Sequence, residues 1–209
     1  MLAALGAGLI LGGCGSVLAP PAAVVAGHKI PAKNVTAALD RFEASSQFAQ
    51  ASQQSGQGAL ARQFEQSYLA RLVRRYVLGA RARQLGVVVT AADVQKALTQ
   101  IEGNFPSQAA FRTALQQQGL TLDQLRPLVR DRVLEQRLRA RVTAHVASRA
   151  AQDQAWLRWL IASYRAARVN VNPRYGTLDL QTQTIVNPAT FPGAAHSSPS
   201  PSPSPSPSG

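Results

Sequence analysis

Apolar and polar residues alternate with a helical period through most of the middle of the chain. Over residues 59–84, apolar side chains return every three or four positions on one stripe, and arginines fill much of the remaining surface. A shorter segment, residues 33–42, repeats this spacing, and residues 152–168 carry it again with both tryptophans, Trp156 and Trp159. Each segment is predicted to be an amphipathic helix. The tryptophans would either complete a core, the simpler interpretation for at least one of them, or line a peptide groove.

Between these segments, residues 84–138 carry explicit start and stop signals for three more helices. Thr90 with Asp93 three positions later, and Thr121 with Gln124, are spaced to accept hydrogen bonds from the first free backbone N–H groups of a helix. The first of these helices is predicted to follow Thr90, the last to follow Thr121, and a short one to lie between them. This stretch is therefore expected to form the centre of the fold.

The last of these three helices is expected to be long. Its apolar positions continue with a helical period from Leu122 to about Arg149. Pro127 lies inside the second turn, where the missing N–H removes one hydrogen bond, so a kink is expected there. Glu135 and Arg139 have the i,i+4 spacing of a favourable ion pair on one helix face.

Two short β-like runs lie far apart in the sequence. Residues 24–30 form the first, with Gly27 as a turn or bulge, and residues 169–176 form the second. Residues 45–58 are rich in Ser, Gln and Gly and are predicted to be a loop, whereas residues 177–209, which end in Ser-Pro repeats, are predicted to be a disordered tail. The expected fold class is mainly α, with about five to six helices and one small two-stranded β pairing of N- and C-terminal segments.

Composition narrows the possible partners. Hydrophobic residues make up 45% of the chain but aromatic residues only 6%, so the core must be largely aliphatic, which suits helices. The chain has 22 Lys+Arg against 10 Asp+Glu, a formal net charge of +12. An acidic partner would explain this excess, but solvated helix faces in an arginine-biased sequence are the simpler explanation. Nucleic acid is not expected as a partner, because no helix-turn-helix glycine or stacking platform is evident.

The single cysteine, Cys14, follows an apolar segment, Met1–Gly13, which is too short to span a bilayer as a helix. The residues from Leu11 to Cys14 resemble a bacterial lipoprotein signal, although no Lys or Arg precedes the apolar run. The resemblance implies that residues 1–13 are a signal peptide, that Cys14 is lipidated, and that residues 14–23 are a tether. Two acyl chains on Cys14 would hold the protein at the extracytoplasmic face of the bacterial cell membrane.

No pattern predicts a catalytic centre. The three histidines, His28, His145 and His196, lie far apart, and none has an acidic residue or cysteine at ligand spacing. No phosphate-binding loop, nucleophile elbow or metalloprotease motif occurs in the sequence. We therefore expect no enzyme activity, no cofactor and no metal.

With the elements placed in order, a resemblance to a known family can be stated. A short strand, a helix, a long arginine-rich helix and two capped helices follow one another as in the N-terminal chaperone domain of SurA. The order is similar also to matching regions of PrsA-type foldase lipoproteins and of trigger factor's peptide-binding part. The resemblance covers residues 24–176. The residues that carry it are Gly27, Leu85, Gly86, Val89, Thr90, Val94, Phe111, Leu115, Gly119, Leu120, Thr121, Leu125 and Arg126.

The resemblance implies a helical chaperone module that holds unfolded or exported polypeptides. In that family a parvulin prolyl-isomerase domain often lies between the long helix and the closing strand. Here only Thr143–Gln154 lies between them, which is too short for such a domain, so no isomerase activity is expected.

Physical reasoning supports polypeptide binding independently. Amphipathic helices around an open cradle would expose apolar surface edged by arginine, which suits extended peptides with apolar and acidic residues. The sequence does not identify the peptide-binding residues. The alternative is an envelope lipoprotein that uses the same scaffold as an adaptor for a single dedicated protein partner.

Overall fold

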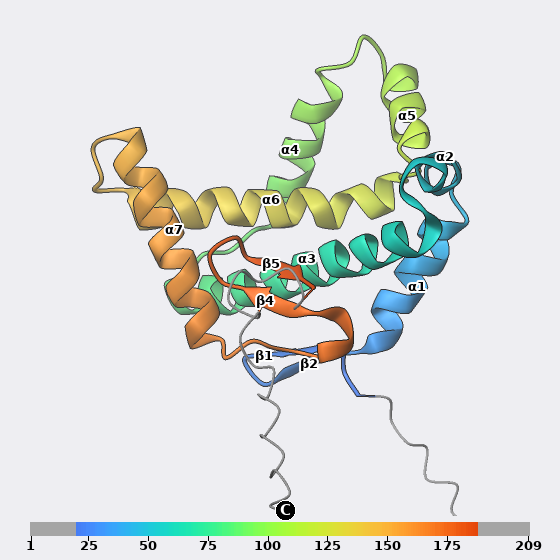
Figure 1. Cartoon of the computed structure of the whole chain (residues 1–209). Coiled ribbons are helices and arrows are strands. Elements are labelled where there is room, and N and C mark those ends of the chain that lie inside the picture. Colours follow the sequence, from blue (N-terminus) through green and yellow to red (C-terminus); the bar gives the residue numbers. More distant parts are fainter. Residues whose placement is uncertain (1–19, 188–209) are drawn as a thin grey trace, which may run out of the picture.

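The computed structural model describes residues 20–187 of the 209-residue chain, and Figure 1 shows their arrangement. The predicted class, mainly helical with a small β component, is confirmed. The described part contains seven α-helices, more than the five to six expected. They are α1 (Ala32–Glu43), α2 (Ser46–Ser55), α3 (Gln57–Leu85), α4 (Ala91–Glu102), α5 (Gln108–Gln117), α6 (Leu122–Thr143) and α7 (Arg149–Ala166).

The longest helix, α3, is the centre of the packing. In Figure 1, α6 runs above it, α7 crosses at one end, and α1 and α2 lie at the other end. Leu69, Val73 and Val77 of α3 are fully buried in the main core. Helices α4 and α5 rise from the far side of α6 as an arm (Figure 1). The sequence forms this arrangement because α3 carries apolar side chains on a stripe wide enough to meet several partners.

A three-stranded antiparallel sheet lies below α3 in Figure 1, formed by β1 (Ala23–Val25), β2 (His28–Ile30) and β3 (Asn170–Val171) in the order β2-β1-β3. Val24 of β1 pairs with Asn170 of β3, which confirms the predicted pairing of distant segments. The first β-like run is a two-stranded hairpin rather than one strand. The chain reverses at Gly27, which has a φ of 79°. A residue with a side chain adopts this backbone angle only with strain.

The ordered unit is longer than residues 24–176 at both ends. Ala22 and Ala23 are buried, so the tether predicted for residues 14–23 ends before them. The prediction of disorder from residue 177 is wrong for residues 177–187, which follow the 3₁₀ turn η1 (Pro173–Tyr175). There β4 (Thr177–Asp179) and β5 (Thr184–Val186) form a hairpin packed on α3, with Ile185 in the main core. Residues 188–209, including the Ser-Pro repeats, lie outside the described residues.

The loop predicted for residues 45–58 is also wrong, because most of it is α2. The Ser45 hydroxyl accepts a hydrogen bond from the N–H of Phe48 at 3.2 Å and so caps the helix. Phe48 is the buried side chain of α2, and its ring meets that of Phe42 edge to face, with 5.3 Å between centroids. One cap and one buried aromatic ring are enough to dock a helix that has no apolar period.

The helix starts predicted at Thr90 and Thr121 are both confirmed, and each is a capping box. The Thr90 N–H donates to Asp93 at 2.8 Å, and the Thr121 N–H donates to Gln124 at 2.9 Å. Helix α6 continues through Pro127 but ends at Thr143, rather than running on to Arg149. The last apolar positions of the pattern therefore belong to the turn before α7.

Candidate peptide-binding groove

Three adjoining cavities lie around the crossing of α3 and α6, and Leu128 of α6 lines all three. The largest, about 410 Å³, is bounded by α1, the start of α2, α3 and the α5–α6 junction, and it is called the groove below. Its lining residues are Ala38, Arg41, Phe42, Ser45, Gln47, Phe64, Tyr68, Arg71, Arg75, Gln118, Gly119, Leu120, Gln124, Pro127 and Leu128.

Three stacked rings form one wall of the groove. Phe42 of α1 stacks on Phe64 of α3, with 4.3 Å between ring centroids and 7° between ring planes. Phe64 in turn stacks on Tyr68 at 5.8 Å, because side chains four positions apart lie on the same helix face. All three rings are only half-buried. The wall is therefore a preformed aromatic surface that remains open to a ligand.

The groove is basic. Arg41, Arg71 and Arg75 line it, and no Asp or Glu does. The Arg71 guanidinium carbon lies 4.9 Å from the centroid of the Tyr68 ring, a cation–π distance. Arg75 is bound to Asp131 of α6 at 2.7 Å, whereas Arg41 and Arg71 are exposed and make no ion pair within residues 20–187. Two arginines of the groove are thus free to bind an anion.

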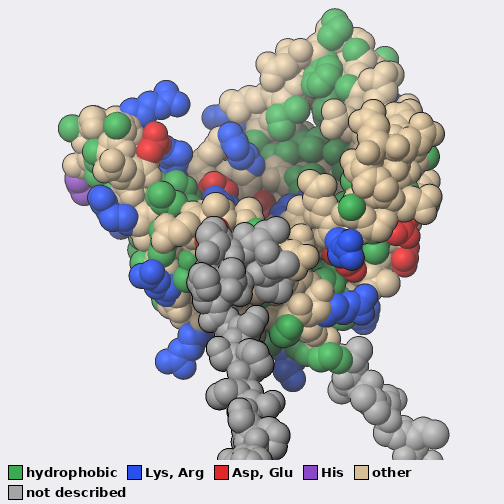
Figure 2. All heavy atoms as spheres, in the orientation of Figure 1, with side chains coloured by type: hydrophobic (Ala, Val, Ile, Leu, Met, Phe, Trp, Pro, Cys, Tyr) green, Lys and Arg blue, Asp and Glu red, His purple; other side chains and the backbone are tan. Residues whose placement is uncertain are grey.

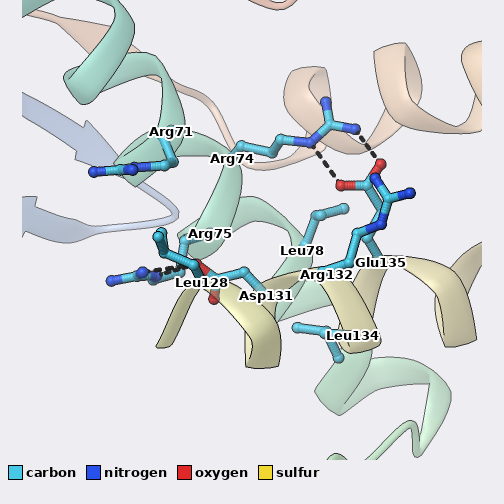
Figure 3. A pocket seen from close by; sticks show the side chains of 9 residues that line it. All are labelled: Arg71, Arg74, Arg75, Leu78, Leu128, Asp131, Arg132, Leu134 and Glu135. Atoms are coloured by element: carbon cyan, nitrogen blue, oxygen red, sulfur yellow. Dashed lines mark hydrogen bonds and ion pairs between the residues drawn. The ribbon is translucent and has the colours of Figure 1, made fainter. Parts of the chain in front are cut away.

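The second cavity, about 190 Å³, lies between α3 and α6 (Figure 3). Arg74 binds Glu135 through two hydrogen bonds, of 3.1 and 2.7 Å, and Figure 3 shows this pair beside the one between Arg75 and Asp131. The predicted pair of Glu135 with Arg139 on one helix is wrong, since Glu135 faces α3 and Arg139 binds Asp153 of α7. A two-pronged contact between helices is stronger than a single exposed pair along one helix.

The third cavity, about 380 Å³, lies under the arm formed by α4 and α5. Its apolar wall comprises Ala97 and Ile101 of α4 with Val129 and Val133 of α6. Figure 2 shows hydrophobic side chains gathered in the hollow beneath this arm. Apolar surface therefore continues from the groove, past Leu128, to the arm.

The predicted candidates for chemistry are not brought together. His28 stacks on Tyr76 of α3, with 4.2 Å between centroids, and His145 lies in the turn between α6 and α7. Cys14 and His196 lie outside the described residues. Among the residues with assigned positions, no group of His, Cys, Asp or Glu is arranged to hold a metal ion.

The tryptophans belong to a core. Trp156 is buried, stacks on Trp159 at 4.9 Å, and packs with Leu138 and Leu160 where α6 meets α7. The core interpretation is therefore right for Trp156, and neither ring lines the groove.

Sequence reasoning did not identify the groove residues. A signal was present, because Phe64, Tyr68, Arg71 and Arg75 are spaced i, i+4, i+7 and i+11 along one stripe of α3. That stripe gives no indication that Phe42 of α1 would complete the wall. A local pattern cannot show which of its members stay half-exposed.

Across residues 20–187, no helix combines the length and the apolar character needed to cross a membrane.

Comparison with known proteins gives one match. The family model described as SurA-like N-terminal domain matches residues 1–139, about two thirds of the chain. A search of curated proteins and a search of solved structures each found no match. SurA-like domains generally occur in periplasmic or extracytoplasmic chaperones. The length of this match shows that the chain belongs to the SurA-like N-terminal domain family, a family of chaperone type.

Proposed function

We propose that this protein is an extracytoplasmic chaperone that is anchored to the membrane through a lipid on Cys14 and binds unfolded or exported polypeptides without isomerase activity. The observation that carries the proposal is the groove, an open cavity with a half-exposed wall of stacked aromatic rings. Family membership gives independent support, because the family is of chaperone type.

The groove has the physical properties that binding of varied chains requires. The Phe42, Phe64 and Tyr68 rings are held by one another, so binding a client costs little additional side-chain entropy. Apolar contacts are not directional and tolerate many sequences, whereas the long side chains of the exposed arginines Arg41 and Arg71 adapt to each client. These properties favour weak and general binding over recognition of one folded surface.

Suppression of aggregation tests the holdase activity. The purified full chain, as the Cys14→Ser form, is mixed with a chemically unfolded exported protein, and light scattering is followed during dilution of the denaturant. We expect scattering to fall at stoichiometric amounts of the protein. Unchanged scattering at a large molar excess would exclude the holdase proposal.

Lipid anchoring has its own test. In bacterial cells the unmodified protein should sediment with membranes, and Cys14→Ser should move it to the soluble fraction, because the thiol is the attachment point of the lipid. If the Cys14→Ser form still sediments with membranes, the proposed anchor is wrong.

Crosslinking in intact cells distinguishes a chaperone from an adaptor. Many crosslinked clients are expected for a chaperone, whereas one stoichiometric band would indicate a dedicated partner. A prolyl-peptide isomerisation assay on the same preparation should give the uncatalysed rate. In the described chain only residues 144–148 connect α6 and α7, which agrees with the proposal of binding without isomerase activity.

A further inference from the structure

The side chains that α3 contributes to the groove are ordered by type along the helix. Phe64 and Tyr68 come first, followed by Arg71 and Arg75. At a rise of 1.5 Å per residue, Phe64 and Arg71 are separated by roughly 10 Å along the axis. The groove therefore has an aromatic part that begins at Phe64 and a basic part that begins at Arg71, and the two parts meet where Arg71 lies over Tyr68.

The basic part lacks anions of its own. Arg75 is already paired with Asp131 of α6, at 2.7 Å, and the groove lining itself contains no carboxylate. Arg71 lies over the Tyr68 ring, where aromatic and cationic surfaces adjoin, and Arg41 approaches from α1 on the neighbouring wall. Both guanidiniums are exposed. A carboxylate entering this part of the groove would meet two uncompensated cations without displacing an existing ion pair.

We propose that the groove selects extended polypeptide segments in which an aromatic side chain and a carboxylate are two to four residues apart. An extended chain advances about 3.3 Å per residue, so roughly 10 Å corresponds to about three residues, and the flexible arginine side chains widen this to two to four. The client's ring adds to the stack formed by Phe42, Phe64 and Tyr68, while its carboxylate binds Arg71 and Arg41. This inference rests on the proposed function, since it specifies what the client-binding groove prefers.

Peptide binding by the full-length Cys14→Ser protein tests this preference. Fluorescence anisotropy compares labelled peptides of Gly, Ser and Gln that contain one Phe and one Asp three positions apart. Matched peptides carry Asn for Asp, Ala for Phe, or the same pair nine positions apart. We expect the three-position peptide to bind about fivefold more tightly than its Asn form, as two partly exposed charge contacts would give. The Ala and nine-position peptides should also bind less tightly.

Two arginine variants test whether the preference for the carboxylate arises in the groove. Arg71→Gln should reduce the difference between the Asp and Asn peptides from about fivefold to about twofold, because it removes one of the two cations that bind the carboxylate. Arg62→Gln is the matched control, since Arg62 is an exposed arginine on the same helix that does not line the groove. It removes the same charge and should leave the difference intact. Circular dichroism spectra that match the parent protein show that each variant is folded.

The outcomes separate this inference from the proposed function. Equal affinity for the Asp and Asn peptides, or equal losses in Arg71→Gln and Arg62→Gln, would overturn the inference even where aggregation is suppressed. The same holds if aggregation is suppressed but no peptide binds. Failure both to bind peptides and to suppress aggregation would overturn the proposed function along with it.

Discussion

At the residue scale, the side chain of Asp93 links the start of α4 to α6. Its carboxylate accepts hydrogen bonds from the backbone N–H and the hydroxyl of Thr90, and it pairs with Arg137 of α6. Arg137 also donates to the backbone carbonyl of Val88. One carboxylate thus caps α4 and fixes its first turn against α6. The Thr90 N–H, together with Arg137 and the Thr90 hydroxyl, lowers the pKa of Asp93 from 3.8 to about 2.

This pKa predicts the acid sensitivity of the arm. Because the folded state binds the Asp93 proton less readily than the unfolded state, the contribution of Asp93 to stability is full above about pH 4 and is lost as the pH falls towards 2. Asp93→Asn should therefore lower the free energy of unfolding at pH 7. The difference from the unmodified protein should shrink between pH 4 and pH 2 in urea titrations. A difference that stays constant over this range would contradict the assignment.

At the scale of elements, the success of the sequence predictions followed the range of the interactions. The N-terminal caps of α4 and α6 were predictable, because Thr90 and Thr121 form hydrogen bonds with residues only three positions away. Helix α2 was missed because its residues have no apolar period, although its Ser45 cap is as local as the other two. The β4–β5 hairpin was missed because it depends on distant segments, with Ile185 packed in the main core. The groove was missed for the same reason, since its wall combines rings from two helices.

The junction between η1 and β4 provides a test of the hairpin. Gly176 has φ of 120°, and a Cβ atom built there would lie 2.4 Å from the carbonyl oxygen of Val186. Gly176→Ala should lower the free energy of unfolding by more than about 1 kcal/mol, because both the backbone conformation and the space exclude a side chain. Chemical denaturation measures this loss.

Gly58 is the matched control for that substitution. It lies in the first turn of α3, and a Cβ atom there would meet nothing within 4 Å. Gly58→Ala should leave stability unchanged or raise it by up to about 1 kcal/mol, as alanine favours a helix. Equal losses in both variants would show that the hairpin does not need the open space at Gly176.

The whole molecule is built from three separate apolar clusters. The main core surrounds α3 and the sheets, a second cluster joins the end of α3 to α6 and α7, and a third joins α4 to α6. Helix α5 buries only Phe111, and its last residue, Gln117, accepts a hydrogen bond from Gln47 of α2 at 3.2 Å. The arm therefore depends on much less buried surface than α3 does.

Hydrogen exchange should show that the arm is less stable than α3. Amides of α5 should exchange faster than those in the middle of α3, because opening α5 exposes little apolar surface. The α5–α6 junction contributes Gln118, Gly119 and Leu120 to the groove, so such openings would widen the groove for bulky clients. Mass spectrometry on peptic fragments provides the comparison, and equal protection of the two helices would contradict it.

The turn that joins α6 and α7 has a consequence for protein engineering. It comprises residues 144–148, lies at one tip of the molecule in Figure 1, and is mostly exposed, whereas the β1–β3 pairing closes the fold elsewhere. A guest domain whose own termini are close together, inserted between Ala147 and Ser148, would leave all three clusters and the groove undisturbed. The scaffold can therefore carry a fluorescent reporter or a foreign enzyme at the end of the molecule opposite the groove.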